Sequence, residues 1–208
     1  MDNAFPLPMF PLSSVMFPFT GIPLHVFEIR YRQLVADLST SPPYFGIILI
    51  TRGSEIGGGD DRASVGTMAR MSEKVELADG RWVILSVGET KIRVTRWLPD
   101  DPYPLALVER IDEVPKEVEQ PGQLGMLEKK LRYCLLLQGE MSLASTVSPN
   151  TVLSPRPEEA LWQMCALAPV PVIDQQRLLE EENAPLRAVR LDQLLTDKIS
   201  ILESQLST

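Results

Sequence analysis

The sequence predicts an α+β protein with a β-rich first part and a helical second part. Short apolar stretches separated by glycine and proline follow one another up to Ile111, as is typical of strands joined by tight turns. From Leu124 onwards, apolar residues recur every three or four positions, as they do on one face of a helix. A charged, proline-containing segment at residues 112–122 separates the two patterns. We therefore expect a β-rich subdomain over residues 1–115 and a helical subdomain over residues 116–208.

The first elements are expected between residues 10 and 38. Residues 10–12 and 15–17 are short, apolar and bounded by proline, which indicates strand pieces near a sheet edge. After a turn at Thr20-Gly21, Pro23 suits the first turn of a helix, because a missing N–H does no harm there. Apolar residues with helical spacing follow at Leu24, Phe27, Tyr31, Leu34, Val35 and Leu38. We expect one helix from Pro23 to Leu38, with Glu28 and Arg32 paired on its surface.

The remaining strands are expected up to residue 111. Residues 44–50 form a continuous apolar run, and residues 65–77 form the next strand. Asp79-Gly80 is a strong hairpin signal, since such turns need positive φ angles. Strands are expected at 81–87 and 90–97, separated by a turn at Gly88-Glu89, and a last strand at 105–111. About six strands with one inserted helix lose their open edges most simply by closing into a small barrel.

The second part is expected to be helical, with helices over 124–138, from Pro157 to about Pro169, over 174–183 and from Pro185 onwards. Cys134 and Cys165 both fall in these stretches. We expect buried free thiols, which fits a reducing cytoplasm, although a disulfide between two helices stays open. No apolar run approaches the roughly 20 residues that span a bilayer, and the N-terminus lacks the pattern of a secretory signal.

Composition and motifs argue against catalysis and against cofactor or metal binding. Residues 53–61 are rich in glycine, but a phosphate-binding P-loop needs Gly-Lys, and the sequence has no such pair. His25 is the only histidine, and we expect it to be a packed or surface residue rather than a catalytic base. The formal net charge of −8 opposes nonspecific binding to phosphate backbones. We expect neither a catalytic residue, nor a cofactor, nor a metal ion.

Seven segments resemble the Lon N-terminal domain, the substrate-recognition module of Lon proteases, in order and spacing. They are FPLSSVMFP at 10–18, PLHVFEIRYR at 23–32, FGIILI at 45–50, VGTMAR at 65–70, DGRW at 79–82, VGETKIRV at 87–94 and DPYPLALVE at 101–109. The resemblance covers nearly the whole chain and is densest over residues 7–111. It implies a pseudo-barrel similar to PUA domains, and it implies that Arg30 and Tyr31 tie the helix to the barrel.

The resemblance also implies a function. It indicates a non-enzymatic module that binds unfolded or exposed apolar protein segments, possessing neither the ATPase nor the protease module of Lon, and acting together with a separate Lon protease or independently of it. We expect the partner to meet aromatic and flexible apolar side chains, and the candidates are Trp97, Tyr103 and Trp162, in a cleft between barrel and helices. The alternative is that these three are ordinary core residues.

A second functional hypothesis is RNA binding, which is suggested by the PUA-like barrel alone. Arg70, Lys91, Arg93 and Arg96 would then form a basic stripe along the strands. The acidic overall charge argues against this alternative, and similarity of fold is a weak reason to assign a function. A small-molecule hydrolase has no motif in its favour.

Overall fold

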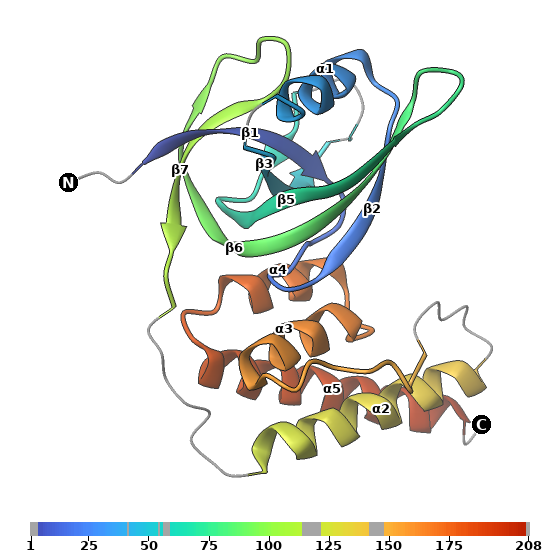
Figure 1. Ribbon diagram of the computed structural model, residues 1–208. Helices are drawn as coiled ribbons and strands as arrows, with labels where there is room; N and C mark the ends of the chain where they lie inside the picture. The colour runs from blue at the N-terminus through green and yellow to red at the C-terminus, as the bar shows by residue number, and fades with distance from the viewer. Residues whose placement is uncertain are drawn as a thin grey trace. The chain divides into compact units, whose positions relative to one another are not determined.

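The computed structural model describes residues 4–40, 42–53, 55, 59–113, 122–141 and 148–206. The chain divides into two compact units, Met1–Asp112 and Glu113–Thr208. The first unit carries all the strands of the described residues, and the second carries helices (Figure 1). The α+β class is therefore confirmed. Residues 114–121, which hold most of the expected linker, lie outside the described residues.

The first unit is a sheet that closes on itself, with one helix, α1 (Ile29–Leu38), packed against it. Its strands are β1 (Phe5–Leu12), β2 (Gly21–Val26), β3 (Tyr44–Arg52), β4 (Asp61–Arg62), β5 (Val65–Glu76), β6 (Trp82–Leu98) and β7 (Leu105–Ile111). The order β1-β7-β6-β5-β3 runs around the unit, and pairing of β1 with β3 closes the ring. This is the predicted pseudo-barrel, with β2 added beside β6 and β4 beside β3.

Strand β1 closes the ring because its two halves have different partners. Its first half pairs antiparallel with β7, where Phe5 lies opposite Val108. Its second half pairs parallel with β3, where Phe10 lies opposite Ile47. One strand therefore joins β3 to β7, and its partner in β7 lies about a hundred residues after it in the sequence.

The inserted helix α1 packs its apolar side chains against the sheet, whereas a separate cluster that includes Met9, Met68 and Ile92 joins strands across the ring. Its buried residues are Tyr31, Leu34, Val35 and Leu38, which share one core cluster with Phe10, Phe45 and Ile84. The rings of Phe10 and Tyr31 are stacked with their centroids 4.2 Å apart. This stacking confirms that Tyr31 ties the helix to the barrel.

The expected start of the first helix is wrong. Residues from Pro23 to Val26 belong to β2, which pairs antiparallel with β6, and the helix begins only at Ile29. Leu24 and Val26 are buried while Pro23 and His25 are exposed, so burial alternates with the period of a strand. His25 is consequently an exposed strand residue and does not lie in a helix.

The predicted turn at Gly88-Glu89 is also wrong, because β6 runs unbroken from Trp82 to Leu98. A Cβ atom at Gly88 would collide with the backbone carbonyl of Phe17, so the glycine permits close packing inside a strand. Residues 15–17, expected as a strand, pair with no described strand. They are held by packing and by the Thr67 hydroxyl, which donates to the Met16 carbonyl at 2.6 Å.

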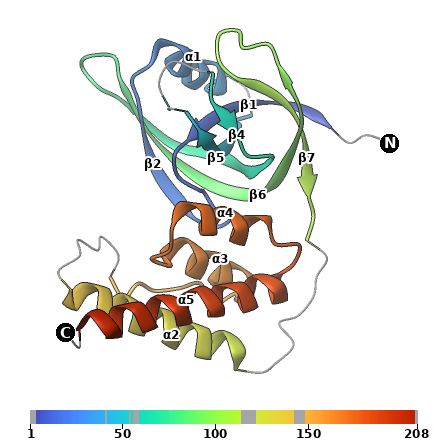
Figure 2. The same cartoon turned by 180° about the vertical axis from the view of Figure 1, so that it is seen from behind.

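The second unit contains the helices α2 (Gln123–Glu140), α3 (Pro157–Leu167), α4 (Val172–Glu180) and α5 (Ala184–Leu206). Pro157 lies in the first turn of α3, and the chain leaves that helix before Pro169, as predicted. Cys134 and Cys165 are buried and free, which confirms the expected thiols. The view from behind shows α2 and α5 lying side by side along their length (Figure 2). No helix among the described residues is long and apolar enough to cross a membrane.

Candidate functional site

A groove of about 510 Å³ lies in the first unit between the end of β1, strand β2 and the start of α1. It is lined by Phe10, Leu12, Ser14, Ile22, Pro23, Leu24, His25, Val26, Phe27, Glu28, Tyr31 and Glu55. We call it the β2 groove. Its volume falls within the roughly 300–1,000 Å³ range of ligand-binding clefts.

The floor of the β2 groove is apolar core, and its rim exposes apolar side chains. Phe10, Leu24 and Tyr31 are buried members of the core cluster. Phe27 lines the groove and is 53% exposed. Ile29 does not line the groove, but it follows two residues later in the chain and is 83% exposed. Large apolar side chains grouped at the mouth of a concave apolar surface are typical of binding sites for apolar segments.

Arg30 organises the charged end of the β2 groove. Its Nε donates to Glu28 Oε2 at 3.0 Å, its Nη2 donates to the Glu55 carbonyl at 3.3 Å, and its guanidinium lies 4.6 Å from the Tyr31 ring centroid. The Ser13 backbone N–H and hydroxyl both donate to the Glu55 carboxylate. The expected pairing of Glu28 with Arg32 is therefore wrong, because Glu28 precedes the helix and binds Arg30.

Tyr31 carries the only phenol that lines the groove. Burial raises the pKa of its hydroxyl to about 12, an effect that neighbouring Arg30 partly opposes. At neutral pH the phenol is un-ionised, so it contributes a ring surface and a hydrogen-bonding group rather than an acid–base catalyst.

Sequence reasoning missed the exposed rim of the groove. It placed Phe27 on the buried face of a helix and assigned no role to Ile29. A signal was present, because Phe27 and Ile29 flank Glu28, and residues two apart cannot both face the core of an α-helix. Recognising that conflict would have indicated a strand end or an exposed apolar pair.

The structure places the three predicted partner-binding residues away from the β2 groove. Trp97 of β6 packs under Arg62, whose guanidinium carbon lies 4.2 Å from its ring centroid. The Tyr103 hydroxyl donates to Asp37 at 2.8 Å. Trp162 belongs to the second unit and is only 4% exposed. None of the three lines the groove.

The residues of the predicted basic stripe do not share one kind of surface. Arg70 is paired with Glu89 at 2.8 Å, and Lys91 is only 3% exposed. Arg93 and Arg96 are exposed on β6. Two exposed cations on one strand form a much smaller positive surface than four would, which weakens the RNA-binding alternative.

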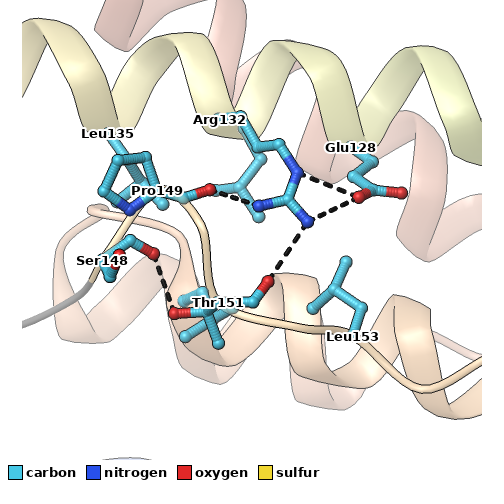
Figure 3. A pocket seen from close by; sticks show the side chains of 9 residues that line it. Glu128, Arg132, Leu135, Ser148, Pro149, Thr151 and Leu153 are labelled. Carbon is cyan, nitrogen blue, oxygen red and sulfur yellow. Dashed lines mark hydrogen bonds and ion pairs between the residues drawn. The ribbon is translucent and has the colours of Figure 1, made fainter.

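A second hollow lies in the helical unit, but it is structural in character. Its volume is only about 10 Å³, enough for roughly one water molecule. Figure 3 shows Arg132 of α2 at its centre, donating to the Glu128 carboxylate and to the carbonyls of Pro149 and Thr151. This guanidinium holds residues 148–153 against the helix.

The described residues contain no group of three or more His, Cys, Asp or Glu side chains that is arranged to hold a metal ion. His25 is exposed on a strand and both cysteines are buried in helices, so no Cys–His pair forms. The Lys74 ammonium donates to the Ser39 hydroxyl, and both residues line a separate hollow of about 270 Å³ in the first unit. The β2 groove is thus the best candidate site, and its chemistry is that of binding.

Comparison with known families identifies the family of the chain. Residues 6–197 match the model of the ATP-dependent protease La (LON) substrate-binding domain. The chain belongs to the Lon substrate-binding domain family. A crystal structure of a Lon N-terminal domain protein from Xanthomonas campestris has a TM-score of 0.64 and 26% identity, and the alignment covers 92% of this chain and 98% of that one.

Further members of the Lon family show the same relationship. The N-terminal domain of a Mycobacterium avium complex Lon protease shares the fold, with a TM-score of 0.59 and 17% identity over 93% of this chain and 99% of that one. The Lon protease of Anaeromyxobacter dehalogenans is 26% identical and Lon protease 2 of Myxococcus xanthus is 27% identical, each over 95% of this chain. The chain spans about a quarter (24%) of the length of these two proteases.

Proposed function

We propose that this Lon-type domain is a non-enzymatic protein-binding module that binds unfolded or misfolded polypeptide through exposed apolar segments. The observation that carries the proposal is an apolar groove with an exposed rim, within a chain whose residues 6–197 match a substrate-binding domain. Desolvation of Phe27, Ile29 and the groove floor by an apolar segment supplies the favourable free energy.

The proposed selectivity for unfolded chains follows from what such chains expose. A folded protein buries most of its contiguous apolar segments, whereas an unfolded one presents them to any apolar groove. Most residues that line the β2 groove are apolar and few are charged, so binding depends mainly on shape and apolar contact. Such a groove can bind peptide segments of many different sequences.

Trp97, Tyr103 and Trp162 are proposed as secondary contacts, below the groove residues. Trp97 and Tyr103 are partly exposed in the first unit and can meet a long segment that extends beyond the groove. Trp162 is almost fully buried, so contact with a partner requires that its surroundings open. Substitution of each by alanine, compared with substitutions in the groove, ranks these contributions.

The experiment is a fluorescence anisotropy titration of the chain against a labelled, permanently unfolded protein, with the folded form of the same protein as the control. We expect micromolar affinity for the unfolded form and no measurable affinity for the folded form. Equal binding of both forms, or of neither, contradicts the proposal. A parallel titration with single-stranded RNA at low salt tests the alternative, since binding to phosphates is strong there and falls steeply with added salt.

A further inference from the structure

Strand β2 presents an open edge beside the groove. Among the described strands it pairs only with β6, and its residues from Ile22 to Val26 line the groove. An open strand edge carries unpaired backbone N–H and C=O groups, which are a template for a further strand. The chemistry of this edge therefore points to an extended polypeptide and not to a helix or a compact ligand.

The position of Pro23 shows which backbone groups face outwards. Pro23 lies opposite Leu85 of β6, and proline has no N–H to contribute to a hydrogen-bonded pair. Pairs alternate along an antiparallel ladder, so residues 22, 24 and 26 are the ones that bond to β6. The Gly88 N–H donates to the Thr20 carbonyl at 2.9 Å, which continues the same alternation. The backbone groups of Gly21, Pro23 and His25 consequently point away from β6.

The opposite side of the groove is also a strand. Phe10 and Leu12 of β1 line it, from the half of β1 that pairs with β3. The Met9 N–H donates away from β3, to the Pro104 carbonyl at 2.8 Å. Pro11, two residues further along, directs its carbonyl to the same side by strand alternation. The groove is thus a gap bordered by backbone groups of β2 and by side chains of β1.

The charge at the groove limits the occupant further. Its lining contains the carboxylates of Glu28 and Glu55 and no lysine or arginine, while Arg30 is already paired with Glu28. A segment that carries a lysine or arginine near the end of β2 is therefore favoured over one with a carboxylate there.

We propose that an unfolded polypeptide binds in the β2 groove as an added strand, pairing with the outward groups of Gly21, Pro23 and His25. The occupant is a segment of about five residues with alternating apolar side chains and a flanking basic residue. Its apolar side chains cover the floor formed by Phe10 and Tyr31. This inference rests on the proposed function and specifies its binding mode. Because Pro23 offers no N–H, only Gly21 and His25 supply N–H donors at this edge, which suits a reversible complex.

The first test uses a labelled peptide in which valine alternates with threonine and lysines flank both ends. Two further peptides carry N-methyl groups on alternate amides, one on the valines and the other on the threonines. Only one set of amides faces β2 in an added strand, so one methylated peptide should bind like the parent and the other should lose roughly tenfold or more in affinity. Equal affinities for the two methylated peptides overturn the inference. A version flanked by glutamates should bind more weakly than the parent.

The second test compares two protein variants that both lose the His25 side chain: His25→Pro, which also removes the edge N–H, and His25→Ala, which keeps it. We expect His25→Pro to bind the peptide roughly three- to tenfold more weakly than His25→Ala, and equal affinities for the two variants overturn the inference. Circular dichroism checks the fold, and the methylated peptides stand as the test if His25→Pro does not fold.

The outcomes separate the two proposals. Binding of unfolded protein with no difference between the methylated peptides overturns the added-strand mode and leaves the proposed function standing. No binding of unfolded protein overturns the proposed function and the mode together. Concentration-dependent dimerisation that His25→Pro abolishes identifies a second copy of the chain at this edge, and that result also overturns the inference.

Discussion

The guanidinium carbon of Arg187 lies 3.4 Å from the centroid of the Trp162 ring, so a cation from α5 covers one face of an indole from α3. The same side chain donates to the Leu178 carbonyl at 3.2 Å, to the Glu181 carbonyl at 3.4 Å and to the Glu113 carboxylate. Arg187 is 1% exposed, and its charge is therefore tolerated only because these groups surround it.

Replacing Arg187 with methionine should destabilise the helical unit by about 3 kcal/mol. The change keeps much of the volume but removes the donor to two carbonyls and the partner of Glu113. Urea unfolding followed by circular dichroism measures the loss. Arg177→Met is the matched control, because Arg177 is exposed and pairs only at the surface with Asp174, and it should cost less than about 0.5 kcal/mol. Similar losses for the two variants would contradict a buried role for Arg187.

Replacing both Phe27 and Ile29 with serine should weaken binding of unfolded protein roughly tenfold and leave thermal stability nearly unchanged. Both side chains are largely exposed, so little buried area is lost within the domain itself. Anisotropy and a thermal melt measure the two effects. Val152→Ser is the control, since Val152 is 90% exposed but belongs to the helical unit. If this control weakens binding as much, the groove is not the binding surface.

Replacing Gly66 with alanine should destabilise the β unit by roughly 1–3 kcal/mol. A Cβ atom there would meet the Ile47 backbone carbonyl of β3, and a carbonyl in a ladder cannot move aside as a flexible side chain can. The contrasting change is Gly125→Ala in α2, where a Cβ atom meets open space and the gain in helix propensity is up to about 1 kcal/mol. We expect the denaturant midpoint to fall for Gly66→Ala and to rise for Gly125→Ala, relative to the wild type. An unchanged midpoint for Gly66→Ala would show that β3 and β5 can separate locally.

Removing the Tyr103 hydroxyl should change how stability depends on pH. Burial, together with the hydrogen bond to Asp37, raises the pKa of Tyr103 from 10.0 to about 12. A raised pKa means that the folded state keeps the proton, so this contribution is complete below about pH 10 and is lost as the pH rises towards 12. Tyr103→Phe should be about 1 kcal/mol less stable than the wild type at neutral pH, and the difference should shrink above about pH 10. A difference that does not vary with pH contradicts the assignment.

Replacing Arg132 with lysine should free residues 148–153 almost as fully as replacing it with methionine. The planar guanidinium donates to Glu128 and to two carbonyls at the same time (Figure 3). The ammonium group of a lysine lacks the several N–H donors in one fixed plane that this requires. Limited proteolysis should cut this segment several-fold faster in both variants than in the wild type. The expected decrease in the free energy of local opening of the segment is about 1–2 kcal/mol. A lysine variant as resistant as the wild type would show that charge alone is sufficient.

The parts of the fold that were predictable from sequence depend on local chemistry. A hairpin turn forms where Asp79-Gly80 predicted one, although only Gly80 has a positive φ angle, of 77°, and the Gly80 N–H donates to the Leu77 carbonyl. Pro157 starts α3, as expected. Glycine and proline act through their own backbone, so their effects do not depend on distant partners. Closure of the ring was predicted from the need to remove open strand edges, and the family resemblance implied the same closure.

The errors arose where a distant partner decided the outcome. Leu24, Phe27 and Tyr31 fit the spacing of a helix, but pairing with β6 made residues 21–26 a strand. Gly88 has the composition of a turn, but it serves the close approach of Phe17. The groove itself combines β1, β2 and the segment near Glu55, and no local pattern links those three segments.

The pairing of Phe5 with Val108 has a consequence for synthesis of the chain on the ribosome. The first strand cannot complete its ladder until β7 has left the exit tunnel, so its apolar residues stay exposed while about a hundred residues are made. At roughly 5–20 residues per second, this period lasts on the order of seconds. A domain proposed to capture unfolded chains is therefore itself, at birth, a target for other copies of its own kind.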